Sequence, residues 1–360
     1  MAEKVQVFVQ TAFLGDVLLS VPFLKNWNYL LDGKKILICR KGVGSLFKEL
    51  ELVDQVIEIE KSKSSTYDAA LKQLSSFEVD TVICAHQSFR STLFVRKIKA
   101  ARKIGYKNFY SFLAYDESID RDLSLPEPIR LLQLLTTVDP SLQGLIIDYR
   151  YNQYPYEYKK GESLKSPPNW ASSDLRLKVQ EKRPFEKVAE ALNLDLKQKR
   201  VALFPGSVWE TKKWTEAGYR SLCSLLIARG YQIVLMGGPD EFTLCELIRE
   251  GQEASIVNLA GKTSLLDSVS LISNCDGVVS NDSAGAHLAS LVDKKIVTVF
   301  GPTVLDFGYR PWSTSTYIAE NKDLFCRPCG PHGHKKCPLG THECMKSVSA
   351  KEVEELTRFF

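Results

Sequence analysis

The residues with the clearest chemical potential lie between positions 277 and 287, where a short apolar run gives way to small and polar side chains. The pattern predicts the end of a buried strand, a tight turn and then a helix. A helix N-terminus presents unpaired backbone N–H groups and the positive end of its dipole, so small side chains there would let a diphosphate approach closely. The candidate anion-binding residues are Asp282, Ser283, Ala284, Gly285 and His287.

The same stretch has two other interpretations. An ordinary strand-to-helix turn with Ser or Asp at the N-cap would have this sequence. Asp282, Ser283 and His287 are also the residue types of a hydrolase triad. We reject the triad because the stretch has no Gly-x-Ser-x-Gly elbow, and because a shared turn is poor evidence for the mutual geometry that a triad requires.

Two more turns of the second half also follow predicted strands. Residues 205–214 follow the strand 200–204 and contain Ser207 and Lys212, and residues 237–241 follow the strand 232–236 and end at Glu241. Backbone N–H groups and a lysine could bind phosphate at the first turn, and the second could contact a ribose or a base. Each turn alone could equally be an ordinary tight turn beside a solvated lysine. Three such turns in one half predict a nucleotide site along one edge.

One carboxylate of the first half, Asp16, is a candidate catalytic group. It follows the predicted strand 4–10, directly after Gly15, and its neighbours Phe13, Leu14 and Val17 are apolar. Open α/β folds bind ligands at the carboxyl ends of their strands, which is where this turn would lie. The alternative role for Asp16 is to cap the helix that follows.

Four of the nine cysteines cluster near the C-terminus, among Pro, Gly and His residues. Cys326, Cys329, Cys337 and Cys344 could hold a structural zinc or iron ion, because a short loop-rich segment gains order from a metal. Their spacing matches zinc-finger patterns poorly, so thiols that simply pack a loop are the alternative. The other five cysteines lie in or beside apolar segments, as reduced core residues would.

The composition is that of a soluble globular protein long enough for two domains, with 360 residues, 44% hydrophobic and 25% charged. A net charge of +4 is too small to indicate nucleic acid as a partner, although it would not oppose a phosphorylated substrate or an anionic membrane surface. No apolar run has the length of a bilayer span or the character of a signal-peptide core. We therefore expect a cytoplasmic protein.

Strand and helix patterns alternate along both halves of the chain, which predicts the α/β class with parallel sheets. Residues 151–170 are rich in Tyr, Lys and Pro, lack a periodic apolar face and are interpreted as the inter-domain region. The predicted domains are 1–165 and 166–345, both Rossmann-like, with the Cys-rich segment at 326–344. Residues 346–360 are predicted to form a C-terminal helix that packs back on the N-terminal domain.

Several motifs in this order resemble the ADP-heptose:lipopolysaccharide heptosyltransferases, glycosyltransferase family 9. They are FLGDV at 13–17 with Pro22, PGS at 205–207, KKW at 212–214, GGPDE at 237–241, SNDSAGAH at 280–287 and FGPT at 300–303. The resemblance covers nearly the whole chain. The segment CPLGTHEC at 337–344 is similar to the heptosyltransferase II branch.

The resemblance implies a GT-B fold, two Rossmann-like domains facing each other across a cleft, with the acceptor bound by the first and the nucleotide sugar by the second. It also implies an inverting transfer that needs no metal. Asp16 corresponds to the catalytic carboxylate and Lys212 to the phosphate-binding lysine. Glu241 corresponds to the acidic nucleoside contact, and Asp282 and His287 to the acid and histidine of the phosphate turn. The family turn usually reads Asp-Ser/Thr-Gly, whereas here Ala284 precedes the glycine.

The resulting hypothesis is transfer of a heptose from ADP-heptose to the lipopolysaccharide inner core, at the inner face of the cytoplasmic membrane and without a required cofactor. One alternative is a related enzyme with another nucleotide sugar or a protein acceptor. The other is a non-catalytic nucleotide-sugar-binding protein whose cysteines hold a metal. Release of ADP that depends on an acceptor would distinguish enzymes from a binding protein.

Overall fold

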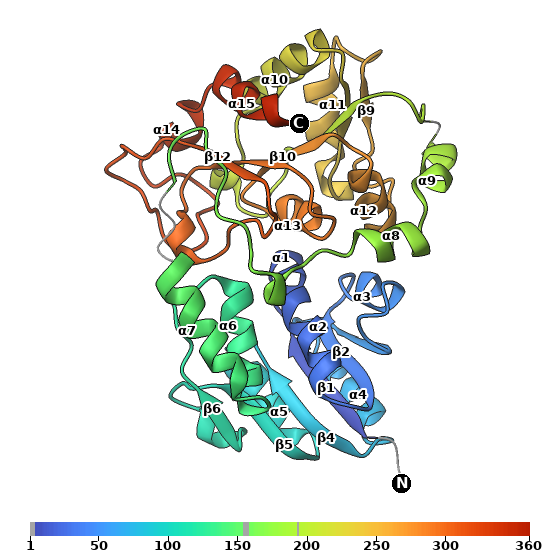
Figure 1. Cartoon of the computed structure of the whole chain (residues 1–360), viewed down its shortest axis with the longest axis vertical. Helices are drawn as coiled ribbons and strands as arrows, with labels where there is room; N and C mark the ends of the chain where they lie inside the picture. Colours follow the sequence, from blue (N-terminus) through green and yellow to red (C-terminus); the bar gives the residue numbers. More distant parts are fainter. Residues whose placement is uncertain (1–3, 154–157, 193) are drawn as a thin grey trace. The chain divides into compact units, whose positions relative to one another are not determined.

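The computed structural model describes residues 4–153, 158–192 and 194–360. The chain divides into two compact units, Met1–Tyr154 and Pro155–Phe360, coloured blue to green and green to red in Figure 1. Each unit contains one six-stranded sheet in which every strand pair is parallel. The expected α/β class is therefore confirmed.

The sheet of the first unit has the order β3-β2-β1-β4-β5-β6. Its strands are β1 (Val5–Gln10), β2 (Lys34–Arg40), β3 (Gln55–Ile59), β4 (Val79–Cys84), β5 (Ala100–Tyr106) and β6 (Glu117–Ile119). Its helices are α1 (Leu14–Leu18), α2 (Val21–Leu30), α3 (Ser45–Glu49), α4 (Ser64–Leu74), α5 (Phe89–Lys97), α6 (Glu127–Gln133) and α7 (Ser141–Gln153).

The central strand β1 is buried on both faces, as expected of a parallel sheet covered by helices. Val7 and Val9 belong to the apolar cluster of one face, and Phe8 points to the other, where its ring stacks on Phe23 with centroids 4.2 Å apart. Pro22 separates two short helices: α1 ends at Leu18, and Pro22 lies in the first turn of α2, where a proline removes no helical hydrogen bond.

The sheet of the second unit has the order β12-β11-β10-β7-β8-β9. Its strands are β7 (Arg200–Phe204), β8 (Gln232–Leu235), β9 (Ile256–Asn258), β10 (Gly277–Asn281), β11 (Ile296–Phe300) and β12 (Thr316–Glu320). Its helices are α8 (Arg176–Lys182), α9 (Phe185–Leu192), α10 (Glu216–Ala228), α11 (Phe242–Arg249), α12 (Leu265–Ser273), α13 (Ala284–Ser290), α14 (Glu343–Lys346) and α15 (Ala350–Leu356).

Both sheets thus have the doubly wound Rossmann order. The first three strands of each unit are added toward one edge of the sheet and the next three toward the other, so the order switches between the first and fourth strands. Ligands of such folds bind at the carboxyl ends of the strands beside this switch point. It lies between β1 and β4 in the first unit, and between β7 and β10 in the second.

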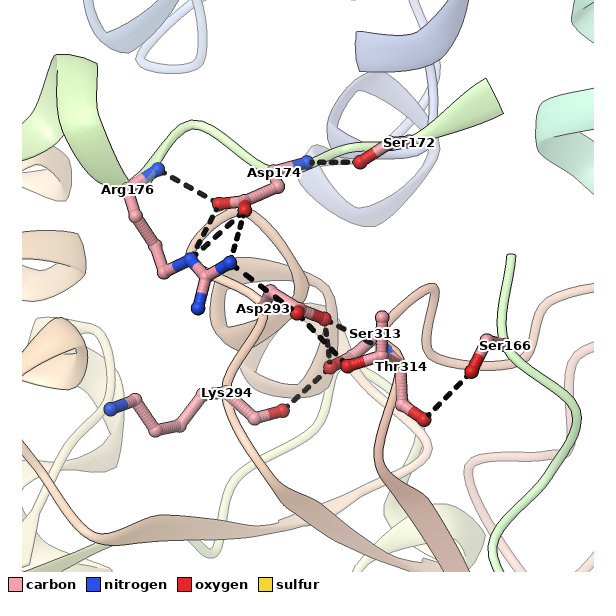
Figure 2. Close-up of polar contacts among 8 residues, drawn as sticks. All are labelled: Ser166, Ser172, Asp174, Arg176, Asp293, Lys294, Ser313 and Thr314. Atoms are coloured by element: carbon pink, nitrogen blue, oxygen red, sulfur yellow. Dashed lines mark hydrogen bonds and ion pairs between the residues drawn. The ribbon is translucent and has the colours of Figure 1, made fainter. Parts of the chain in front are cut away.

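The boundary between the units falls before residue 155 and not between 165 and 166 as predicted. The reason is that the described segment after it is tied to the second unit. The backbone N–H of Leu164 donates to the carbonyl of Thr316 in β12 at 2.8 Å. Figure 2 shows a second attachment, where Arg176 pairs with Asp174 at 2.6 Å and reaches Asp293, whose carboxylate accepts from the hydroxyl of Ser313 at 2.9 Å.

The C-terminal segment also differs from the prediction, which packed residues 346–360 on the N-terminal domain. Helix α15 instead contacts α10, β11 and β12 of the second unit. Its apolar residues Val353 and Leu356 are buried in the core of that unit, because they are spaced to lie on one face of the helix. Within the described residues, no helix is long and apolar enough to span a bilayer.

Candidate active site

The three predicted turns of the second unit lie at one edge of its sheet. They follow β7, β8 and β10, which are neighbours in the order β10-β7-β8. Since the strands are parallel, their carboxyl ends, and with them the three turns, meet at the same edge. We call this the nucleotide edge, defined by residues 205–214, 237–241 and 281–287.

The centre of the nucleotide edge is an ion pair between Lys212 and Asp282. The ammonium nitrogen Nζ lies 2.6 Å from Oδ2 of Asp282, and the Thr303 hydroxyl donates to the same oxygen at 2.7 Å. Burial acts to raise the pKa of Asp282, but the charge and hydrogen bond of Lys212 outweigh it and lower that pKa below its usual value. Asp282 is therefore ionised at neutral pH, and it holds the lysine head group at the sheet edge. Thr303 was not predicted as a site residue.

His287 lies one turn into α13 and is buried beside this pair. Burial lowers its pKa to about 4, the Lys212 charge also lowers it, and the Asp282 carboxylate opposes both. Its imidazole is therefore neutral at pH 7. The Nδ1 atom is buried and has no hydrogen-bond partner within the described residues, so this nitrogen can bond a ligand.

Packing at the start of α13 explains why position 285 is a glycine. A Cβ atom on Gly285 would lie 2.3 Å from the ring of Phe204, so glycine is required where the helix passes β7. Ser283 is the N-cap residue and Ala284 the first helical residue. Both are half-buried. The glycine is thus explained by packing within the protein, while Ser283 and Ala284 form the accessible part of the turn.

Glu241 bridges two of the turns. Its Oε2 accepts the N–H of Gly238 at 2.8 Å, and Cβ atoms on Gly206 and Gly237 would lie 1.6 and 2.3 Å from its carboxylate oxygens. The two glycines thus make room for this side chain. Burial raises the pKa of Glu241. Ser207, in the neighbouring turn, is half-buried and accepts the N–H of Trp209 at 3.3 Å.

Asn281, at the end of β10, was not predicted as a site residue but connects the nucleotide edge. Its carbonyl oxygen accepts the N–H of Trp214 at 2.9 Å, and its amide donates to the carbonyl oxygens of Pro205 and Gly206 at 2.8 and 3.2 Å. The residue is fully buried. The available signal in the sequence was an amide at the end of an apolar strand, where a buried polar group needs partners.

Asp16 lies in the first unit, whereas the other predicted site residues belong to the second. It is half-buried in the first turn of α1, and its Oδ2 accepts the N–H of Phe13 at 3.2 Å. The alternative capping role is therefore present, and it occupies one carboxylate oxygen. A capping bond leaves acceptor capacity on the carboxylate, so it is compatible with a catalytic role.

Polar residues that were not predicted gather at the same switch point of the first unit. His86 follows β4, and its Nδ1 lies 2.8 Å from the hydroxyl of Ser91, while its Nε2 lies 3.2 Å from Nζ of Lys61. Burial and the Lys61 charge lower the pKa of His86 to about 4. Burial lowers the pKa of Lys61, Arg40 and Arg90 lower it further, and Asp16 opposes them. The Asp16 carboxylate thus interacts with the charge of Lys61.

The four C-terminal cysteines line one pocket, together with Thr211 and His342. All are free thiols. The Cys337 sulfur accepts the N–H of His342 at 3.4 Å, and backbone N–H groups lower its pKa, whereas burial raises the pKa of Cys344 to about 11. Across the described ranges, no three His, Cys, Asp or Glu side chains are arranged to hold a metal ion.

Comparisons with known proteins agree with this architecture. Residues 68–341 match the model of glycosyltransferase family 9 (heptosyltransferase). The lipooligosaccharide heptosyltransferase 2 of Campylobacter jejuni serotype O:2 is 32% identical over 354 residues, covering 95% of this chain and 94% of the relative.

Two solved structures are similar in fold. The Escherichia coli ADP-heptose lps heptosyltransferase II has a TM-score of 0.73 at 19% identity, with 99% and 98% of the two chains covered. The E. coli heptosyltransferase WaaC with ADP-2-deoxy-2-fluoro heptose has a TM-score of 0.67 at 19% identity, with 98% of each chain covered. The resemblance seen in the sequence and the expected GT-B fold are thereby confirmed, and the chain belongs to glycosyltransferase family 9, the heptosyltransferases.

Proposed function

We propose that this protein transfers a heptose from ADP-heptose to a hydroxyl of the lipopolysaccharide inner core, with inversion at the anomeric carbon and without a catalytic metal. Family membership supports the reaction class. The observation that carries the proposal is the Lys212–Asp282 pair beside His287 at the nucleotide edge, because it places a fixed cation and a neutral imidazole where a diphosphate would bind.

The donor diphosphate would bind at this pair. An ammonium group has three donors, so Lys212 can keep its bond to Asp282 and still donate to phosphate oxygens. As the bond between the anomeric carbon and the ADP oxygen breaks, negative charge develops on the leaving diphosphate, and the preorganised lysine stabilises it. The free Nδ1 of His287 and the turn at Ser283 and Ala284 would bond the remaining oxygens.

The nucleoside would extend along the edge toward Glu241. This carboxylate accepts the N–H of Gly238 and packs against Gly206, where a Cβ atom would displace it. Its orientation is therefore fixed before a ligand binds. A carboxylate accepts hydrogen bonds from ribose hydroxyls, which suits the nucleoside role that the family resemblance assigns to it. Ser207, in the turn after β7, is half-buried and is a further candidate contact of the donor.

Asp16 would act as the general base of the first unit. The acceptor hydroxyl attacks the anomeric carbon from the face opposite ADP, a new C–O bond forms as the bond to ADP breaks, and the hydroxyl proton passes to the Asp16 carboxylate. The charge of Asp16 interacts with that of Lys61, which Arg40 and Arg90 also affect. The positive charge of these three side chains suits an anionic acceptor.

In this mechanism the lysine supplies the positive charge that a divalent ion would otherwise provide, so no metal takes part in the transfer. Zinc or iron held by Cys326, Cys329, Cys337 and Cys344 would be structural, and the four thiols around one pocket fit such a site in chemistry. We further propose that the protein works in the cytoplasm, in transient contact with the inner membrane surface that carries its acceptor.

The test is an assay with the purified protein, ADP-heptose and inner-core lipopolysaccharide from a strain that lacks this enzyme. We expect one added heptose by mass spectrometry and ADP release that requires the acceptor. ADP-heptose hydrolysis without an acceptor product, or binding without turnover, would refute transfer. A product formed only with another nucleotide sugar, or on a protein, would replace the donor or the acceptor.

A further inference from the structure

The Cys-rich segment, residues 326–344, is hydrogen-bonded to both loops that supply the partners of Asp282. One is the loop 209–213, which carries Lys212, and the other is the loop 301–305, which carries Thr303. The backbone N–H of Cys329 donates to the carbonyl of Pro302 at 2.7 Å, and the Arg327 guanidinium donates to the carbonyl of Thr303 at 2.7 Å. The segment therefore contacts the chain on both sides of the proposed phosphate site.

The contacts are densest at Thr211, the residue before Lys212. Its N–H donates to the carbonyl of His334 at 3.1 Å, and its hydroxyl lies 2.7 Å from the N–H and 2.9 Å from the carbonyl oxygen of the same residue. The carbonyl of Thr211 lies 2.9 Å from Nε2 of His342. Every backbone and side-chain polar group of Thr211 is therefore bonded to the Cys-rich segment, and the residue is buried.

The loop that Thr211 belongs to has little other regular structure. It consists of the single 3₁₀ turn Glu210–Lys212, and Val208 before it is exposed. The ring of His332 stacks on Trp209 with centroids 6.3 Å apart, and a Cβ on Gly333 would lie 3.4 Å from Cγ of Lys212. The Cys-rich segment therefore contacts the loop at Trp209, Thr211 and Lys212.

Among these contacts, the one made by His342 is a side-chain contact that a substitution can remove. A carbonyl oxygen only accepts hydrogen bonds, so Nε2 of His342 must carry the proton and donate to Thr211. The backbone of His342 has a φ of +53°, and its N–H donates to the sulfur of Cys337. The ring thus connects the cysteine pocket to the residue beside the lysine.

We propose that His342 is a positioning residue for the nucleotide diphosphate: its bond to the Thr211 carbonyl fixes the backbone from which Lys212 reaches the phosphates. This inference rests on the proposed donor role of Lys212. A loop that is fixed before binding loses less conformational freedom when the ligand arrives, so removal of the contact should weaken binding of the diphosphate and not of the nucleoside.

The experiment measures binding of ADP and of adenosine by calorimetry to the full-length wild-type protein and its variants. We expect His342→Ala to weaken ADP roughly tenfold and to change adenosine affinity less than about twofold. His342→Gln should recover most of the ADP affinity, since its amide can donate to the same carbonyl. Ala and Gln share the strain of the positive φ, so their difference reports the hydrogen bond.

The matched control is His334→Ala, in the same segment, because the contacts of His334 with Thr211 run through its backbone and survive the substitution. It should bind ADP like the wild type. His342→Asn is a second disrupting variant, which tolerates the left-handed backbone but is too short to reach Thr211.

A double-variant cycle separates positioning from a general structural effect. If His342 acts through Lys212, then His342→Ala should weaken ADP no further in the Lys212→Ala background. Two results would overturn this inference alone. One is that His342→Ala weakens ADP binding by the same factor in the Lys212→Ala background as in the wild type. The other is that His342→Ala and His342→Asn both bind ADP like the wild type, while Lys212→Ala is impaired. ADP binding unaffected by Lys212→Ala would overturn the donor role and this inference together.

Discussion

At the scale of single residues, the position of the Lys212 charge depends on its ion pair with Asp282. Lys212 is mostly buried and bonded to Asp282, whereas its neighbour Lys213 pairs at 2.6 Å with Glu210, whose side chain is largely exposed. An exposed ion pair contributes little, but a mostly buried lysine paired with a fully buried carboxylate has a defined position. The two adjacent lysines therefore form a natural comparison.

Replacement of Lys212 by Ala should weaken ADP strongly and adenosine little, because the lysine acts on phosphate charge. We expect a loss of about tenfold to a hundredfold for ADP, the usual range for a charge-assisted hydrogen bond. Lys213→Ala should show a clearly smaller loss. Calorimetry with ADP, UDP and GDP on the wild type checks the base preference, since ADP should bind most tightly; equal affinities would contradict the donor assignment.

Replacement of Asp16 by Asn should lower turnover by about a hundredfold to ten-thousandfold, the usual contribution of a positioned general base, and leave ADP affinity nearly unchanged. The amide oxygen of Asn can still accept the N–H of Phe13, so the cap of α1 is retained and the comparison isolates the base. Single-turnover rates and calorimetry measure the two effects. Near-normal turnover in this variant would reduce Asp16 to a helix cap.

At the scale of elements, the turns of the nucleotide edge need glycine for room more than for flexibility. The Cβ of an alanine at position 206 would overlap the Glu241 carboxylate, whereas a Cβ on Gly238 would meet nothing within 4 Å. The two glycines of neighbouring turns should therefore respond differently to the same substitution.

We expect Gly206→Ala to destabilise the protein by about 1–2 kcal/mol, the usual scale of overpacking, as it expels Glu241 from its bond to Gly238. Gly238→Ala should have a smaller effect. Thermal unfolding monitored by circular dichroism measures both. The double variant Gly206→Ala/Glu241→Ala should regain part of the loss, and failure to do so would mean that the strain arises elsewhere.

The Cys-rich segment makes a further expectation testable at this scale. Transfer should proceed without added Mg²⁺ and should survive a chelator as long as the fold is intact, because the proposed chemistry uses Lys212 in place of a metal. Elemental analysis of the purified protein distinguishes a structural zinc or iron from thiols that only pack. A strict need for Mg²⁺ would contradict the mechanism.

The sequence predicted elements best where local pattern and burial agree. The range of β7 matches the predicted strand 200–204, since apolar residues follow Arg200 without interruption up to Phe204. Strand β12 was missed because Thr316–Glu320 is an edge strand that follows a long irregular stretch. Helices α8 and α9, which follow the segment interpreted as the inter-domain region, were also missed.

In the candidate site, too, the residues that belong to local motifs could be predicted and those that act through long-range contacts could not. Residues at strand ends, such as Lys212 and Asp282, could be found from motifs because the parallel sheet brings strand ends together. Asn281, Thr303 and His342 act through contacts over 67, 21 and 131 positions of the chain. Such pairings depend on tertiary packing, which no local pattern encodes.

At the scale of the whole molecule, each unit has a histidine with a lowered pKa at its switch point, the half-buried His86 in the first and the buried His287 in the second. The pKa of both His86 and His287 is lowered to about 4. Between about pH 4 and the usual value of 6.5, the unfolded chain binds these protons and the folded chain does not, so folding stability is full above pH 6.5 and falls as the pH decreases. Each unit should therefore be less stable in mild acid.

For the second unit we expect His287 to account for a loss of about 2 kcal/mol between pH 7 and pH 5. The variant His287→Gln cannot titrate there and should show a correspondingly flatter dependence. Urea unfolding followed by tryptophan fluorescence measures it, since Trp170, Trp209, Trp214 and Trp312 lie in the second unit and only Trp27 in the first. A slope that is unchanged in the variant would contradict the buried neutral state of His287.

The contacts of the Cys-rich segment also determine when, during synthesis of the chain, the nucleotide edge can form. The ribosome delivers the first unit complete before the second begins, but the loop at Thr211 needs His334 and His342, and the indole N–H of Trp214 donates to the carbonyl of Val348 at 3.0 Å. A nascent chain that has passed β11 would carry every strand-end motif of the nucleotide edge and still lack the residues that fix it. The capacity to hold a nucleotide should thus arise only after Val348 has been added, so that shorter ribosome-bound fragments do not compete for the donor.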